Sequence, residues 1–234
     1  MKTIGLIGGM SWESTVTYYQ VINETIKKEL GGLHSAKIIL YSVDFAEIEE
    51  CQSKGEWERS AEILGEAAQA LETAGADFIL ICTNTMHKVL PQIQRQVNIP
   101  FLHIAGAAAE QIKRQEINKV LLLGTKYTMQ QDFYKEKLIA EGIEVFIPDE
   151  MEMDFVNMVI FEELCLGQIR EESRQYVMEI IERYVGDGIG GVVLGCTEIG
   201  LLIEPEMVSV PVFDTALIHA DKAAILAMKN META

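Results

Sequence analysis

Short, nearly continuous apolar runs alternate along the whole chain with long segments that have helical spacing. An apolar run without polar alternation is typical of a strand that is buried on both faces, as in a parallel sheet covered by helices. The expected strands are Ile4–Ile7, Ile38–Val43, Phe78–Ile81, Val120–Leu123 and Gly191–Leu194, and the clearest helical segments are Ser14–Leu30 and Glu56–Thr73. This order predicts an α/β fold built on parallel sheets.

The chain also repeats itself. The strand that ends at Gly8 resembles the strand that ends at Gly124, an offset of 116 residues. Thr83 and Cys196 follow similar buried strands at an offset of 113, and Ile99–His103 resembles Val210–Asp214 at 111. Three matches in one order predict two similar parallel-sheet α/β domains related by a pseudo-two-fold, with the active site in the cleft between them. Chance likeness between apolar strands is the alternative.

The domain boundaries follow from this repeat. We expect a first α/β domain over residues 1–103 plus 212–234 and a second over residues 104–211. The 234 residues, of which 49% are hydrophobic, are enough for these cores.

Charge restricts the partners. Lys and Arg number 19 against 36 Asp and Glu, so the formal net charge is −17. Nucleic-acid phosphates and anionic membrane surfaces would repel such a chain, and no apolar stretch is long enough to cross a bilayer. We expect neither partner, and the unpaired spacing of the four cysteines favours a cytoplasmic protein. Neither the cysteines nor the four scattered histidines have metal-ligand spacing, so no metal is expected.

Each predicted domain carries a polar motif directly after a buried strand. These motifs are Thr83-Asn84-Thr85 and Cys196-Thr197-Glu198. Each residue taken alone is also compatible with a helix cap or a core position.

Three motifs carry a resemblance to a known family. They are Gly8-Gly9-Met10 with Ser11-Trp12-Glu13-Ser14, Cys82-Thr83-Asn84-Thr85-Met86-His87, and Gly195-Cys196-Thr197-Glu198-Ile199. Together they resemble the aspartate/glutamate racemase family, and most closely its broad amino-acid or aspartate racemase subgroup. The resemblance implies an isomerase that uses no cofactor, acts on a small amino-acid or dicarboxylate substrate and often forms a homodimer.

The family pattern implies one cysteine on each face of the substrate α-carbon, and this chain departs from it. Cys196 occupies the second position, but Thr83 stands where the first cysteine is expected and Cys82 lies one residue earlier. Because successive strand side chains alternate between faces, Cys82 is expected in the core. A hydroxyl does not ionise near neutral pH, so Thr83 is expected to be a poor base. The sequence therefore predicts an asymmetric Thr83/Cys196 pair in an amino-acid racemase.

The resemblance also assigns substrate-binding positions. Asn84, Thr85 and Thr197 would hold the α-carboxylate as an oxyanion site, Met10 and Ser11 would offer N–H groups, and Thr125 occupies the corresponding turn of the second domain. Gln52 and Arg59 are candidates for the substrate side chain, with a solvated surface position as the alternative. Glu198 would tune Cys196 or bind the ammonium group, whereas His87 and His103 are expected to be buried and hydrogen-bonded.

Two other functions remain open. Relatives on the same fold use cysteine to isomerise or decarboxylate a small dicarboxylate. The missing first cysteine also leaves room for an amino-acid binder without catalysis.

Overall fold

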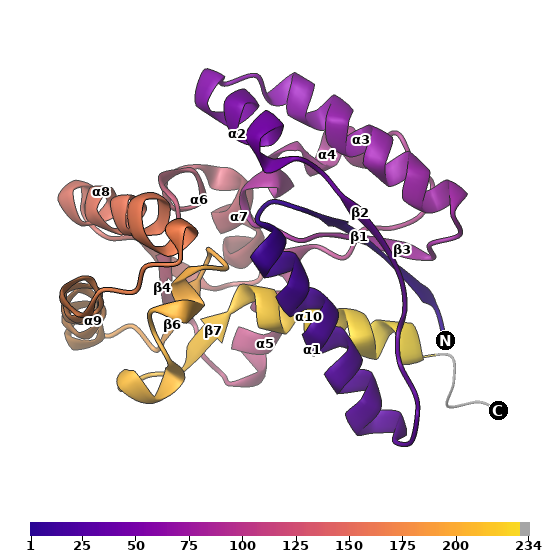
Figure 1. Ribbon diagram of the computed structural model, residues 1–234. Coiled ribbons are helices and arrows are strands. Elements are labelled where there is room, and N and C mark those ends of the chain that lie inside the picture. The colour runs from indigo at the N-terminus through magenta and orange to yellow at the C-terminus, as the bar shows by residue number, and fades with distance from the viewer. Residues whose placement is uncertain (230–234) are drawn as a thin grey trace. The chain divides into compact units, whose positions relative to one another are not determined.

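The computed structural model describes residues 1–229, and the chain divides into two compact units (Figure 1). Unit 1 comprises Met1–Ile104 and the C-terminal segment from His219. Unit 2 comprises Ala105–Ile218. No helix in the described part of the chain is long and apolar enough to cross a membrane.

Unit 1 is built on a parallel sheet with strand order β2-β1-β3. The strands are β1 (Thr3–Gly8), β2 (Lys37–Ser42) and β3 (Phe78–Ile81). Phe101 extends the sheet beyond β3 through a single parallel bridge to Ile79. Every side chain of β3 is buried, as the unbroken apolar run predicts.

Helices cover both faces of this sheet. They are α1 (Trp12–Leu30), α2 (Phe45–Lys54), α3 (Trp57–Thr73), the 3₁₀-helix η1 (Thr85–Val89), α4 (Leu90–Gln94) and α10 (Thr215–Met228), whose first turn belongs to unit 2. Within the unit, α3 lies on one side of the sheet and α1 on the other (Figure 1). Leu64, Ala68 and Leu71 of α3 pack with Ile79 and Ile81 of β3 in one hydrophobic core.

Unit 2 repeats the plan with strand order β5-β4-β6-β7, all parallel. Its strands are β4 (Lys119–Leu123), β5 (Glu144–Phe146), β6 (Gly191–Leu194) and β7 (Val212–Asp214). Its helices are α5 (Ile104–Arg114, from Ala105 on), α6 (Lys126–Gln130), α7 (Asp132–Ala140), α8 (Glu150–Met158) and α9 (Glu171–Gly186), joined by a π-helical turn η2 (Val159–Glu163) and 3₁₀ turns η3 (Leu164–Leu166), η4 (Ile199–Leu201) and η5 (Pro205–Met207). The α/β fold with parallel sheets and two similar halves is therefore confirmed.

The hydrogen bonds at the strand ends give the residue equivalence between the units. The Cys82 amide donates to a carbonyl of β1 at 2.9 Å, and the Gly195 amide donates to the corresponding carbonyl of β4 at 2.6 Å. Cys82 and Gly195 each follow the third strand of their unit at the same ladder position. The next residues, Thr83 and Cys196, are therefore structural equivalents, at the offset that the sequence repeat indicates.

The chain returns from unit 2 to unit 1 at His219, seven residues later than the boundary expected from the sequence. Residues 212–218 were assigned to the first domain, whereas they belong to unit 2. The physical reason is β7, which pairs in parallel with β6 from Val192↔Val212 to Leu194↔Asp214. The run Val212–Asp214 has only three residues, too few for periodicity to indicate its sheet.

Candidate active site

The turn after β1 is shaped by a close backbone approach. Gly9 has φ +95°, and a Cβ built there would lie 2.2 Å from the Val43 carbonyl oxygen, so a side chain is excluded. The Gly9 amide donates to Thr15 Oγ1 at 2.8 Å. Met10 is buried, and Ser11 is the N-cap of α1, its hydroxyl accepting from the Ser14 amide at 3.3 Å. This cap leaves the N-terminal N–H groups of α1 at the end of β1.

The first polar motif occupies the turn between β3 and η1. Asn84 and Thr85 are buried, whereas Thr83 is half-buried. Among the described residues the Thr83 hydroxyl makes no hydrogen bond, so no base lies against it there. Cys82 is fully buried and burial raises the pKa of its thiol far above the usual range. Cys82 is therefore a core residue, as the strand alternation predicts.

Next to this motif lies a cluster of three histidines, in which His87 and His219 are buried, whereas His103, which was expected to be buried, is half-buried. The ring of His87 lies 4.6 Å from that of His103 and 5.9 Å from that of His219, centroid to centroid. His219 Nε2 lies 2.8 Å from the Leu102 carbonyl oxygen, and its Nδ1 lies 2.9 Å from the Tyr18 hydroxyl. Because a carbonyl only accepts, Nε2 carries the proton and Nδ1 accepts from Tyr18. Burial lowers the pKa of His219 to about 3, so the ring is neutral.

Acid should therefore destabilise the protein through His219. Its folded pKa of about 3 lies below the ordinary unfolded value of about 6.5, so the folded state binds fewer protons in that window. The contribution to stability is complete above about pH 6.5 and is lost as the pH falls, by about 2 kcal/mol at about pH 5. In urea unfolding, His219→Gln should remove this part of the pH dependence, since Gln can still donate to Leu102 but does not titrate. An equally steep loss in that variant would contradict the assignment.

The second polar motif contains a thiol paired with a carboxylate. Cys196 Sγ donates to Glu198 Oε2 at 3.0 Å, and the Thr197 hydroxyl donates to the same oxygen at 2.7 Å. Burial and the nearby Glu198 carboxylate raise the pKa of Cys196 well above its usual range. Cys196 is therefore a thiol near neutral pH, hydrogen-bonded to the Glu198 carboxylate.

Thr125 caps α6 as Ser11 caps α1. Its hydroxyl accepts from the Thr128 amide at 3.4 Å, and the residue is buried. Next to it a Cβ on Gly124 would lie 3.1 Å from the Gly195 carbonyl oxygen, so the turn after β4 packs on the turn after β6. The structure thus brings Thr125 and the Cys196 motif to the same end of the sheet of unit 2.

The two candidates for the substrate side chain lie in different environments. Gln52 of α2 is buried. Arg59 of α3 is exposed and forms ion pairs with Glu62 at 3.0 Å and Glu47 at 3.6 Å, which is the solvated surface position given as the alternative.

Lys88 lies in η1, just after the Thr83 motif, and the sequence analysis did not name it as a candidate. Its Nζ lies 3.6 Å from the centroid of the Trp57 ring, and burial lowers its pKa. Lys88 follows Thr85 by three residues in the 3₁₀-helix η1, where side chains three apart eclipse. That spacing within the motif is the signal that could have indicated it.

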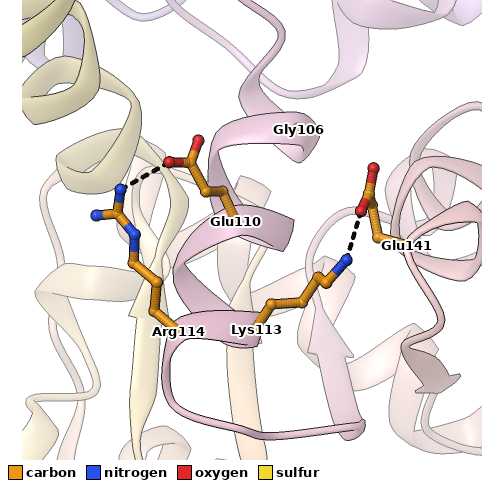
Figure 2. Close-up of a pocket in the computed structure, with 5 residues that line it drawn as sticks. All are labelled: Gly106, Glu110, Lys113, Arg114 and Glu141. Carbon is orange, nitrogen blue, oxygen red and sulfur yellow. Dashed lines mark hydrogen bonds and ion pairs between the residues drawn. The ribbon is translucent and has the colours of Figure 1, made fainter.

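Two hollows lie in unit 2. One of about 440 Å³ is lined by Gly106, Glu110, Lys113, Arg114 and Glu141 and carries two ion pairs, Arg114 with Glu110 and Lys113 with Glu141 (Figure 2). It contains no candidate site residue. The other, of about 250 Å³, lies beside the Cys196 motif and includes Leu194, Gly200 and Asp214, the last of which caps α10.

The candidate site residues are divided between the two units. Unit 1 carries Met10, Ser11, Gln52 and the Thr83 motif, and unit 2 carries Thr125 and the Cys196 motif. Within residues 1–229 no three His, Cys, Asp or Glu side chains are grouped in a way that could hold a metal ion.

Two parallel-sheet units, each with a polar motif after its third strand, are compatible with the racemase class that the motifs resemble. Comparison with known proteins identifies the family. The family model for Asp/Glu/hydantoin racemases matches residues 7–223, so the chain belongs to this family and is a racemase. It is 24% identical over 217 residues to the broad specificity amino-acid racemase RacX of Bacillus subtilis, with 91% of this chain and 92% of RacX covered.

Solved structures agree. A Yersinia pestis crystal structure with the provisional name Asp/Glu racemase is 54% identical, with a TM-score of 0.93 over 98% of this chain and 100% of that one. An aspartate racemase homologue from Pyrococcus horikoshii is 43% identical, with a TM-score of 0.85 over 98% and 100%. The expected family and class of enzyme are therefore confirmed.

Proposed function

We propose that this racemase removes and returns the α-proton of an amino acid without a cofactor, using Cys196 and Thr83. The observation that carries the proposal is the equivalence of these two residues at the ends of β6 and β3. Equivalent positions in two similar halves suit a reaction that needs one group on each face of an α-carbon.

The roles of the two groups differ. The Cys196 thiol loses its proton to solvent and the thiolate then takes the α-proton, while Glu198, hydrogen-bonded to the sulfur at 3.0 Å, tunes that ionisation. The Thr83 hydroxyl returns a proton on the opposite face, replenished from water. Because a hydroxyl is a poor base, abstraction from the Cys196 side is fast and abstraction from the Thr83 side is slow. The subgroup resemblance favours the L enantiomer on the Cys196 side.

Neutral donors stabilise the intermediate. When the α-proton leaves, negative charge moves into the α-carboxylate, and preorganised N–H and O–H groups lower the energy of that state. We assign this work to Asn84, Thr85 and Thr197, together with the N–H groups at Met10, Ser11 and Thr125. In a chain of net charge −17 such local donors must overcome the overall field.

For the substrate we propose an amino acid of the aspartate or glutamate type, or a related small dicarboxylate. Gln52 is buried and polar, and Lys88 is a partly desolvated cation one 3₁₀ turn from Thr85. Both suit the distal carboxylate of such a substrate better than the exposed, ion-paired Arg59 does.

Exchange of the α-proton with solvent deuterium tests this function. The purified chain is incubated with D- and L-amino acids in heavy water without added cofactor, and the loss of the Cα–H signal is followed by NMR. A racemase exchanges aspartate or glutamate. A binder without catalysis only shifts resonances, and a decarboxylase or cis-trans isomerase of dicarboxylates leaves amino acids unchanged, so either result would overturn the proposal.

Glu198 should control the ionisation of Cys196. Its carboxylate raises the thiol pKa, so Glu198→Gln should lower that pKa and speed alkylation of Cys196 by iodoacetamide near neutral pH. Cys165 is exposed and is replaced by Ser in both proteins so that it does not consume the reagent. Glu204→Gln removes a carboxylate that lines the hollow beside the motif and does not shift the Cys196 pKa, so it should leave the rate unchanged. Slower alkylation of the Glu198→Gln protein would contradict this role.

We also propose a cytoplasmic homodimer. All four cysteines are free, as in a reducing compartment. Trp12, Val16 and Tyr19 form an exposed apolar stripe at helical spacing on α1, a surface that a second copy of the chain would cover. Light scattering of the purified chain should give twice the protomer mass.

A further inference from the structure

Two pairs of buried or partly buried hydrogen bonds in unit 1, joined by the backbone of residues 102–104, lead from Tyr18 to the backbone of Thr83. Tyr18 of α1 donates to His219 of α10, and His219 donates to the Leu102 carbonyl at 2.8 Å. Two residues further on, the Ile104 amide donates to His87 Nε2 at 3.3 Å. His87 Nδ1 lies 2.9 Å from the Thr83 carbonyl oxygen. The segment 102–104 thus connects the two histidines.

The partners fix the protonation of His87. A backbone N–H only donates, so Nε2 must be the unprotonated nitrogen, and a carbonyl only accepts, so Nδ1 must carry the hydrogen. Both bonds therefore exist only in the neutral Nδ1–H tautomer. Burial, His103 and His219 all lower the pKa of His87 well below its usual range, which keeps the ring neutral.

The Thr83 carbonyl lies between two secondary-structure elements, outside the backbone hydrogen bonds of either one. β3 ends at Ile81 and η1 begins at Thr85, so residues 82–84 lie between two elements. The His87 bond holds this carbonyl, while the His87 amide returns a bond of 3.1 Å to the Asn84 carbonyl. A side chain that binds the backbone of the turn at this point limits the rotation of Thr83 about its own φ and ψ.

We propose that His87 is a positioning residue, which holds Thr83 at the orientation needed for proton return by donating from Nδ1 to the Thr83 carbonyl. This inference rests on the proposed function in giving Thr83 its role. His87 acts on the reaction through the backbone of Thr83 and not by contact with the substrate.

Two substitutions separate the two hydrogen bonds of His87. In His87→Asn the amide nitrogen takes the place of Nδ1, so the donor to Thr83 is kept and the acceptor for Ile104 is lost. In His87→Gln the amide group takes the place of Nε2, so an acceptor for Ile104 is kept and the donor to Thr83 is lost. Each variant leaves one buried backbone group without a partner, so both should lose similar stability. His34→Asn, at an exposed histidine, is the control.

If His87 positions Thr83, His87→Gln and His87→Asn should differ in kcat although they lose similar stability. His87→Gln should lower kcat for α-proton exchange by roughly 10- to 100-fold with little change in KM, while His87→Asn should stay within about threefold of wild type. Without substrate, amide hydrogen exchange of residues 83–87 should be faster in His87→Gln than in His87→Asn. Equal losses of kcat, or losses that follow thermal stability alone, would overturn the proposal.

A measurement on the unmodified protein keeps the inference testable if a variant does not fold. Nitrogen NMR of the histidine rings should show His87 as the Nδ1–H tautomer, with no titration near its usual pKa. The Nε2–H tautomer, or ordinary titration, would overturn the proposal. The tautomer and the amide exchange are read without turnover, so they remain decisive if the wild type fails to exchange amino-acid α-protons and the proposed function itself fails.

Discussion

Cys196→Ala is expected to abolish racemisation, with kcat reduced by at least roughly 10³-fold. A methyl group cannot accept the α-proton, and no other thiol of unit 2 occupies the end of β6. The buried side chain is small, so circular dichroism should be unchanged. The measurement is α-proton exchange of both enantiomers of aspartate and glutamate in heavy water.

Cys165 supplies a matched control for this experiment. It is an exposed thiol in the same unit and the weakest of the influences on the pKa of Cys196, and Cys165→Ala removes a sulfur atom that lies outside the Cys196 motif in sequence. Its rate should match that of wild type. Retained exchange in a folded Cys196→Ala protein would remove Cys196 from the mechanism. Loss of activity in both variants would mean that a second thiol takes part.

Thr83→Cys should convert one-sided catalysis into two-sided catalysis. The new thiol is of similar size and, near neutral pH, adds little charge, but unlike a hydroxyl it reaches the ionised state. Wild type should exchange the α-proton of one enantiomer much faster than that of its mirror image. In the variant the slow enantiomer should gain roughly 10-fold or more, which makes the two rates more nearly equal. Equal rates in wild type would mean that a neighbour already activates Thr83.

Cys82 is the internal control for this change. It is fully buried beside Thr83, so Cys82→Ala should lower the free energy of unfolding by about 1 to 3 kcal/mol through lost packing. The ratio of the two enantiomer exchange rates should stay as in wild type. A large loss of activity without unfolding would assign the second thiol to Cys82 and remove Thr83 from the pair.

Local pattern was sufficient for most of the fold. The apolar runs predicted five of the seven strands in the described chain to within one residue, because burial in a parallel sheet imposes a short continuous apolar signal, whereas the three-residue strands β5 and β7 were not predicted. The internal repeat predicted the equivalence of Thr83 and Cys196, which the ladder hydrogen bonds of Cys82 and Gly195 match. Strand alternation placed Cys82 in the core. Each of these inferences depends on neighbours within a few residues.

Local pattern could not predict the point at which the chain returns from unit 2 to unit 1. β7 is three residues long, and its partnership with β6 decides to which unit it belongs. Pairing between strands joins residues that are about 20 positions apart here, and a short apolar run is compatible with either sheet.

The environment of the site residues also came from tertiary structure. Glu198 stands two residues from Cys196, yet its contact with the sulfur depends on the turn after β6. The state of the histidines depends on still more distant partners, since His219 contacts Tyr18 across 201 positions and Leu102 across 117. Sequence therefore determined the five longer strands, the repeat and the residue types of the two motifs, because these follow from local pattern. Tertiary structure decided the protonation of Cys196 and His87, because a pKa depends on burial and on partners that only the folded chain brings into contact.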